Sequence, residues 1–176
     1  MMTPAAPVPD GMTILGEGTA RASSLQVVKP SRRIPSLYAD PLSWLVLEAV
    51  TDAVTAAGPC LDRDLGHIVV SDVCTLHTMR GLAGAIPNGR MSPLRFSGAN
   101  PGQICGFAMQ LLQLRGPSLV LSMTPSQGRH PAMIVLRNWL RERTAAAVIL
   151  SLHEWDSDEH RVTSTIFGTT DGSAGT

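Results

Sequence analysis

The chain has 176 residues, enough for one domain with a substantial hydrophobic core. Its 14 basic and 14 acidic residues cancel, so no overall charge favours nucleic acid or an anionic membrane as a partner. Hydrophobic residues make up 44% of the chain and charged residues only 16%, and this apolar balance predicts that a partner covers part of the surface.

Several features of the sequence predict a soluble protein of the cytoplasm. The opening segment MMTPAAPVPDG lacks the basic and apolar regions of a secretion signal, and the longest apolar runs are too short to cross a bilayer. Cys60, Cys74 and Cys105 are odd in number and lack CxxC spacing, which favours reduced thiols. We therefore expect a cytoplasmic chain that neither enters a membrane nor binds nucleic acid.

The sequence divides into a leader, one domain and a tail. Residues 1–11 are rich in proline and alanine and predict a disordered leader, and residues 169–176 predict a flexible tail. The domain between them, residues 12–168, opens with two short predicted strands, at 13–15 and 25–28.

A helical pattern begins at Asp40. Asp40 is a suitable N-cap, Pro41 fits the first helical position, and the Gly58-Pro59 pair ends the element. Between these signals, apolar residues recur at helical spacing and form one stripe. This stripe predicts a helix that packs on a core.

The rest of the domain alternates apolar strands with helices. The predicted strands cover residues 66–71, 117–123, 144–152 and 160–167, the last as an edge strand. The predicted helices cover residues 75–86, 100–114 and 128–143. Such alternation, with middle strands that are apolar throughout, is typical of a mostly parallel sheet with helices on both faces. The sequence therefore predicts a single α/β domain.

The order of motifs resembles the amino-terminal half of a β-ketoacyl synthase, a condensing enzyme of the thiolase fold. Four segments carry the likeness: a long helix with the strand after it, an SP…F…N…G segment before a helix, a GPS strand, and a final helix with its strand. They read LSWLVLEAVTDAVTAAGP with GHIVVSD, SPLRFSGANPGQICG, GPSLVLS, and HPAMIVLRNWLRERTAAAVILSLHE. The likeness spans residues 12–155 and is nearest to the short ketosynthase-like proteins of bacterial polyketide gene clusters. It implies a single thiolase-like half with a five-stranded sheet.

The resemblance also implies that the condensing nucleophile is missing. Counted along the family's spacing from Gly116, the nucleophilic cysteine falls at Pro125. A thiolate there would be stabilised by a helix amino terminus, whereas proline has no nucleophile and removes a backbone N–H. The family's two catalytic histidines belong to a carboxy-terminal half that this sequence does not contain. We therefore do not expect this chain to catalyse condensation by itself.

The resemblance further implies a partner. In the family, the helix after the nucleophile is buried between two halves, and the helix predicted here over 128–143 is apolar around most of its circumference. A helix apolar on all sides must be covered on all sides, so we expect a second copy or another subunit against it. The strand at 117–123 resembles the one that pairs across the family's dimer axis.

Ser126 and His130 are candidates for a replacement site, a hydroxyl near a helix start with an imidazole one turn later. The competing interpretation makes Ser126 the helix cap and His130 an ordinary first-turn residue. Ser–His catalysis also needs an orienting acid, which the sequence does not identify. Cys74 and His77, three residues apart, are interpreted as a buried thiol and an unrelated histidine, because two ligands do not make a zinc site.

Three further segments are interpreted as turns. HEWDSDEH, at 153–160, crowds acidic and histidine side chains but meets no metal-site spacing, so it predicts a solvated hairpin turn. The glycine-rich pieces LGEGTA and GLAGAIPNG fail the dinucleotide and phosphate-loop patterns. We expect neither a cofactor nor a metal.

Three hypotheses of function follow. The first is a non-condensing ketosynthase-like subunit of bacterial polyketide or fatty-acyl-type secondary metabolism, acting like a chain-length factor as a homodimer or as a heterodimer with a ketosynthase-type subunit. The second is a small enzyme of acyl-thioester transfer, hydrolysis or cyclisation that uses Ser126 and His130 in the cleft after Pro125. The third is a module that binds an acyl carrier protein through exposed arginines.

Overall fold

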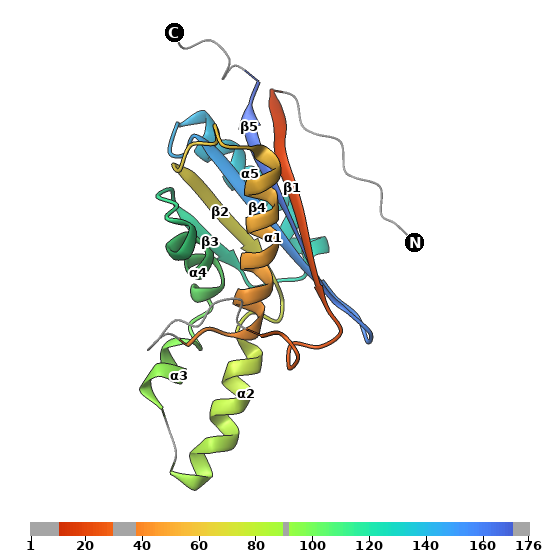
Figure 1. Ribbon diagram of the computed structural model, residues 1–176, viewed down its shortest axis with the longest axis vertical. Helices are drawn as coiled ribbons and strands as arrows, with labels where there is room; N and C mark the ends of the chain where they lie inside the picture. The colour runs from red at the N-terminus through yellow and green to blue at the C-terminus, as the bar shows by residue number, and fades with distance from the viewer. Residues whose placement is uncertain (1–10, 30–37, 90–91, 171–176) are drawn as a thin grey trace.

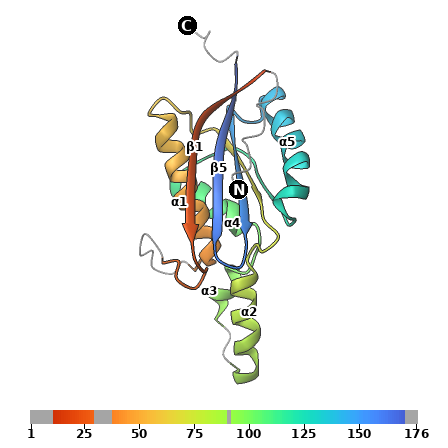
Figure 2. The same cartoon turned by 90° about the vertical axis from the view of Figure 1, so that its right-hand side faces the viewer.

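The computed structural model of the chain describes residues 11–29, 38–89 and 92–170 (Figure 1). Five strands form one sheet in the order β1-β5-β4-β2-β3. They are β1 (Met12–Ala22), β2 (Leu65–Val70), β3 (Ser118–Leu121), β4 (Ala147–Trp155) and β5 (His160–Thr169). The helices α1 (Pro41–Ala57) and α4 (Gln103–Leu112) cover one face of the sheet, and α5 (Pro125–Arg141) lies against the other (Figure 2).

The sheet is mixed, and the prediction of a mostly parallel sheet is wrong. β2 pairs in parallel with β3 and β4, whereas β5 pairs antiparallel with both β4 and β1. The short connection at 156–159 explains the reversal, because a tight turn joins antiparallel neighbours and a parallel pair needs a long crossover. β5 consequently lies inside the sheet rather than at its edge, and the two edge strands are β1 and β3.

The predicted start and end of α1 are confirmed. Asp40 is the N-cap, and its carboxylate accepts the N–H of Leu42 at 2.9 Å. The other oxygen of the same carboxylate accepts the N–H of Thr78 in the first turn of α2, also at 2.9 Å. Gly58 ends α1 with a positive φ of 88°, a backbone conformation that glycine adopts without strain.

The glycine-rich piece LGEGTA is part of β1, so its interpretation as a turn is wrong. α1 lies so close to β1 that a Cβ on Gly16 or Gly18 would collide with backbone atoms of the helix, at Ala53 and Ala49. The glycines therefore serve helix-on-strand packing rather than chain reversal. This close contact helps to build the larger core, which lies between α1, α4 and the sheet.

α5 is amphipathic, and the prediction of a helix apolar around most of its circumference is wrong. The residues that α5 buries recur every fourth position: Gly128, Ala132, Leu136 and Leu140. The outer side carries the exposed side chains of Arg129, Arg137 and Arg141, and Ile134 among them is 55% exposed. Because one side of α5 packs on the sheet and the other side is charged, the helix itself does not require a neighbour on all sides.

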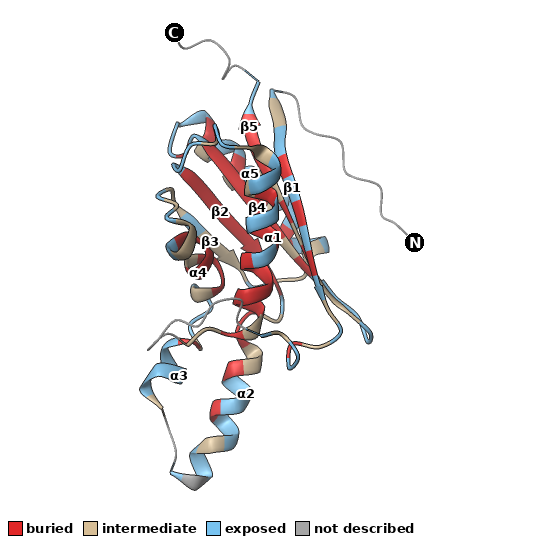
Figure 3. Cartoon of the chain, viewed as in Figure 1, coloured by how far each residue is buried: buried red, intermediate tan, exposed pale blue. Residues whose placement is uncertain are grey.

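An arm projects beyond the end of the sheet. It consists of α2 (Leu76–Ala85), η1 (Ile86–Asn88) and α3 (Pro93–Ser97) (Figures 1 and 2). Much of the arm is exposed (Figure 3), including four large apolar side chains: Met79, Ile86, Leu94 and Phe96. The piece GLAGAIPNG forms the end of α2 and η1, so its interpretation as a turn is also wrong.

Several predicted boundaries shift. Residues 13–15 are part of the longer β1, and residues 25–28 form no strand. α5 begins at Pro125, before the predicted start at 128, because proline fits the first helical position. β5 runs to Thr169, one residue into the predicted tail. Thr170 is described as well, whereas residues 171–176 of the predicted tail and residues 1–10 of the predicted leader lie outside the described residues.

The sequence analysis expected no apolar run long enough to cross a bilayer. In the part of the chain that the structure describes, no helix has the length and apolar character needed to span a bilayer.

Candidate functional site

The carboxyl ends of β2, β3 and β4 meet the start of α5 at one edge of the sheet. This is the edge at which the three strands end, not the side formed by an edge strand. In open sheets with parallel strands, ligands commonly bind at this edge. Two hollows lie there, one of about 240 Å³ beside Pro125 and one of about 490 Å³ beside the first turns of α2. Trp155, the last residue of β4, lines both. We therefore treat this edge as the candidate site.

Pro125 has a structural role at the place where the resemblance puts a nucleophile. It is the first residue of α5, and Thr124 is the N-cap. Proline suits this position because the N–H it lacks would have no acceptor within the helix and its φ is already helical. Pro125 lines the smaller hollow with Ser126 and His153, among others, but offers that hollow neither a nucleophile nor a backbone N–H.

The structure does not bring Ser126 and His130 together as a nucleophile and its base. Both side chains are exposed, and within the described residues no hydrogen bond joins them. Ser126 Oγ lies instead 3.0 Å from Oγ1 of Thr124. Because Thr124 is the N-cap and Ser126 the second helical residue, the interpretation of Ser126 as the cap is wrong. The earlier start of α5 also moves His130 into its second turn.

The two buried cysteines are inert thiols. Cys74 Sγ–H donates to the carbonyl of Ser71 at 3.1 Å, and Cys105 Sγ–H donates to the carbonyl of His67 at 3.1 Å. Burial raises the pKa of Cys74, and it raises the pKa of Cys105 to about 12. Both groups stay protonated near neutral pH and are poor nucleophiles. His77 lines the larger hollow, whereas Cys74 does not line it. This agrees with the interpretation of the two as unrelated residues.

A chain of hydrogen bonds runs from the loop after β2 to β5. Ser71 Oγ accepts the N–H of Val73 at 3.2 Å and the N–H of Cys74 at 3.0 Å, and it lies 2.8 Å from Nδ1 of His153. Nε2 of His153 lies 3.1 Å from Nδ1 of His160. We call Ser71, His153 and His160 the relay.

The direction of every bond in the relay follows from counting donors and acceptors. A serine hydroxyl has two acceptor sites and one hydrogen, and two backbone N–H groups fill both acceptor sites of Ser71. Its hydrogen must therefore go to Nδ1 of His153. A neutral His153 then carries its own hydrogen on Nε2 and donates it to Nδ1 of His160, which leaves the hydrogen of a neutral His160 on Nε2.

Burial keeps the relay neutral. Desolvation, with the nearby His160 as a smaller cause, lowers the pKa of His153 to about 4. Desolvation also lowers the pKa of His160, against a weaker opposite effect of Asp156. Since both imidazoles are uncharged at neutral pH, the hydrogen positions deduced above apply there.

The predicted hairpin turn is confirmed, but the sequence analysis missed what its flanking histidines do. β4 ends at Trp155 and β5 begins at His160, and the carboxylate of Asp156 accepts the N–H groups of Asp158 and Glu159 in the turn between them. His153 lies before this turn and is fully buried. Ile149, Ser151 and His153 share one face of β4, and Ile149 alone marked that face as part of the core, so the signal for a buried His153 was weak.

Within the described ranges, no group of three or more histidine, cysteine or acidic side chains is arranged to hold a metal ion.

Comparisons with known proteins identify the fold. No protein-family model matches the chain, and no curated protein matches it. Among solved structures, the chain is similar to the ishigamide ketosynthase/chain length factor, with a TM-score of 0.68 and 11% identity over 93% of this chain and 63% of that one. The chain therefore has a ketosynthase-like thiolase fold. The predicted resemblance is confirmed at this level.

Two further structures of similar fold are complexes. One is the ketosynthase ApeO with its chain length factor ApeC from Xenorhabdus doucetiae, at a TM-score of 0.63 and 10% identity over 92% of this chain and 80% of that chain. The other is AntDE:AntF, a ketosynthase with its acyl carrier protein, at 0.64 and 12% over 90% and 62%. The chain thus spans somewhat less than two thirds of the length of two of these three structures.

Proposed function

We propose that the chain is a non-condensing ketosynthase-like subunit that pairs with a ketosynthase-type partner, in a chain-length-factor-like role within polyketide or fatty-acyl-type secondary metabolism. The observation that carries this proposal is Pro125 at the first position of α5, where the resemblance puts the nucleophile. The protonated thiols of Cys74 and Cys105 do not substitute for it. Supporting evidence comes from two solved neighbours whose names include a chain length factor.

The open edge of β3 supports pairing with a partner. The carbonyls of Pro117 and Leu121 accept N–H groups of His67 and Ser71, at the two ends of the β2–β3 pairing. Successive residues of a strand direct their backbone groups to alternate sides, so Ser118 and Val120 direct theirs away from β2. An edge strand of this kind is a template for another chain.

The arm supplies a second surface, an apolar one, for binding a partner. Met79, Ile86, Leu94 and Phe96 are each at least half exposed, and Phe96 reaches 64%. Large apolar side chains that gather on one projecting element are more typical of an interaction surface than of a solvated one. The high proportion of hydrophobic residues in the sequence is therefore explained partly by this arm and not by α5.

The test of this proposal is co-purification with a ketosynthase encoded in the same gene cluster. The variant Val120→Pro removes an outward N–H of β3 without removing a bond to β2, so we expect a folded chain that no longer co-purifies. The control Val120→Ala removes more of the side chain but keeps the N–H, and should still co-purify. Co-purification of all three forms in equal yield would exclude β3 as the pairing edge, and a chain that never binds any such ketosynthase would overturn the proposal.

The alternative, a small acyl-thioester enzyme that uses Ser126 and His130, stays a prediction with its own test. If it is correct, Ser126→Ala and His130→Ala each abolish product formation in the reconstituted pathway while leaving partner binding unchanged. Under the pairing proposal, both variants keep full activity, because the two exposed side chains share no hydrogen bond within the described residues.

A further inference from the structure

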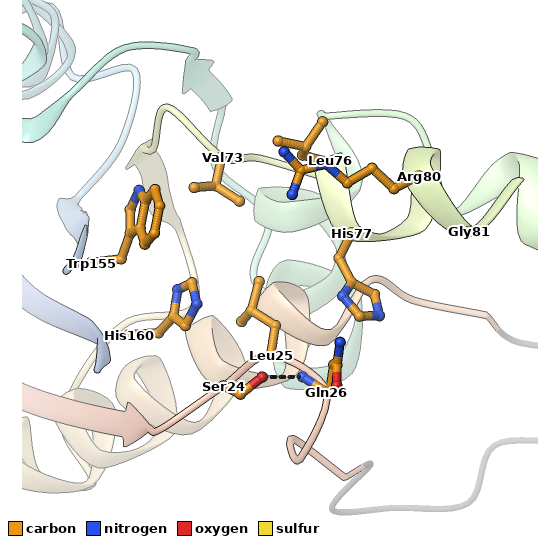
Figure 4. Close-up of a pocket in the computed structure, with 10 residues that line it drawn as sticks. All are labelled: Ser24, Leu25, Gln26, Val73, Leu76, His77, Arg80, Gly81, Trp155 and His160. Atoms are coloured by element: carbon orange, nitrogen blue, oxygen red, sulfur yellow. Dashed lines mark hydrogen bonds between the residues drawn. The ribbon is translucent and has the colours of Figure 1, made fainter. Parts of the chain in front are cut away.

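The larger hollow at the candidate site has the size and walls of a small-molecule pocket. Its volume of about 490 Å³ lies within the range of roughly 300–1,000 Å³ that is usual for ligand sites. Figure 4 shows Trp155 and His160 on one side, His77 and Arg80 on the opposite side, and Leu25 with its neighbours below. These walls come from four separate parts of the chain: the turn after β1, the start of α2, β4 and β5.

The apolar part of the pocket suits a flat or branched hydrocarbon. Leu25, Val73 and Leu76 line it, and Trp155 places its indole there while remaining 54% exposed. The indole lies nearly parallel to the ring of His160, with the ring centroids 5.7 Å apart and 12° between the planes. An indole held in a fixed orientation, but half uncovered, offers a surface on which an apolar ligand can stack.

The polar part of the pocket offers donors and one full positive charge. The hydrogen that the relay places on Nε2 of His160 has no acceptor among the described residues, and it lies on the side of the ring away from His153. Arg80 adds a guanidinium, whose paired N–H groups match a carboxylate. Among the ten described residues that line the pocket, none is acidic. The pocket therefore favours an acceptor with a single negative charge.

We propose that this pocket binds a small organic carboxylate with an apolar or aromatic body. The N–H of His160 donates to the carboxylate, Arg80 across the pocket supplies the positive charge, and the body lies against Trp155 and Leu25. The relay gives His160 this function: Ser71 orients His153, and His153 orients His160 so that a donor, rather than an acceptor, faces the ligand. Ser71 and His153 are positioning residues. This inference does not rest on the pairing proposed above, since every residue in it belongs to this chain.

The experiment is a titration of the full-length chain with 4-phenylbutyrate and with its uncharged analogue 4-phenylbutyramide, followed by isothermal titration calorimetry and tryptophan fluorescence. The carboxylate should bind saturably and the amide should bind about tenfold or more weakly, the usual effect of losing a charge-assisted hydrogen bond. In Trp155→Phe, the heat of binding should persist while most of the fluorescence change disappears, which would place the ligand at this indole rather than at Trp44 or Trp139.

Substitutions of the two donors, Arg80 and His160, are compared with a substitution that only removes a positive charge from the surface. Arg80→Gln should remove most of the preference for the carboxylate, whereas Arg129→Gln, an exposed arginine on α5, should leave both affinities unchanged. His160→Phe keeps a ring beside Trp155 but removes the donor, and should weaken both compounds by about threefold to tenfold, because the amide carbonyl also accepts this hydrogen. Equal affinities for acid and amide, equal effects of the two arginine variants, or no saturable binding of either compound would each overturn the proposal.

Discussion

The two faces of the sheet differ in how completely they are covered. α1 packs on β1, β5 and β4, and α4 packs on β2 and β3, so the face beneath them is closed from one edge of the sheet to the other. On the opposite face α5 packs mainly on β4 and β2. There β1 and β5 carry polar side chains: Glu17, Thr19, Arg21, Thr163 and Thr165.

The closed face therefore contributes most of the stability of the fold, whereas the other face remains in contact with solvent. The closed face contains the larger apolar core and the glycines that let α1 approach β1. The open face is polar where no helix covers it, so the described chain does not need a second half to shield that surface. Of the nine large apolar side chains that are exposed among the described residues, four lie on the arm and one, Ile134, lies on the outer side of α5.

The largest expected effect comes from Gly18→Ala on the closed face. The added Cβ would collide with the carbonyl of Ala49 and the N–H of Ala53, and backbone atoms of a packed helix cannot move aside easily. We expect a loss of more than about 3 kcal/mol in the free energy of unfolding, measured by urea denaturation. Gly106→Ala is the matched control, because its Cβ would meet no atom within 4 Å, and it should stabilise the chain by about 0.8 kcal/mol. Equal effects of the two substitutions would contradict the close packing of α1 on β1.

The next effect compares the two sides of α5. Leu136→Ala removes a fully buried side chain and should lower the free energy of unfolding by about 3 kcal/mol. Ile134→Ala, two residues away and 55% exposed, should change it by less than about 0.5 kcal/mol in the isolated chain. A large loss from Ile134→Ala would mean that the outer side of α5 is covered in solution, as the sequence analysis expected.

An effect that is smaller per residue is a loss of stability in mild acid. On the closed face His67 is fully buried, its Nε2 lies 2.9 Å from Ser151 Oγ, and desolvation lowers its pKa to about 4, the same value as for His153. The unfolded chain takes up these protons near pH 6.5, whereas the folded chain takes them up only near pH 4, so stability falls as the pH decreases through that interval. At pH 5 each of the two histidines should account for about 2 kcal/mol of that loss.

Urea denaturation at pH 7 and pH 5 measures this loss directly. His153→Gln should reduce the difference between the two pH values, whatever its effect at pH 7, and the exposed control His130→Gln should leave the difference unchanged. A parent chain with equal stability at both pH values would contradict the buried, neutral state of His67 and His153.

The sequence predicted the elements whose signals are local. Asp40 with Pro41 marked the start of α1, Gly58 marked its end, and the turn at 156–159 follows from its polar composition. β1 was missed because glycines such as Gly18 read as turn residues, and the helix that makes them necessary comes from a distant part of the chain. The antiparallel pairing of β1 with β5 was missed because β1 was not recognised as one long strand, whereas the predicted hairpin turn already implied that β4 and β5 run antiparallel.

The candidate site could be predicted only in part. The family's spacing placed the nucleophile position at Pro125, close to the start of α5, although the predicted helix began three residues later. The relay could not, because its members are 82 and 7 positions apart and meet only through the register of β2, β4 and β5. His153 and His160 also have the polarity expected of a turn, and the alternation of Leu150, Ser151, Leu152 and His153 groups the imidazole with the polar positions of the strand.

The measurement that tests the central claim most directly is a condensation assay of the reconstituted pair in which the partner ketosynthase has lost its nucleophilic cysteine. If this chain is a non-condensing subunit, product formation should fall to background, because Pro125 offers no nucleophile at the start of α5. The intact pair in the same assay should be active, and the chain alone should form no product. Residual condensation that depends on the presence of this chain would contradict the account.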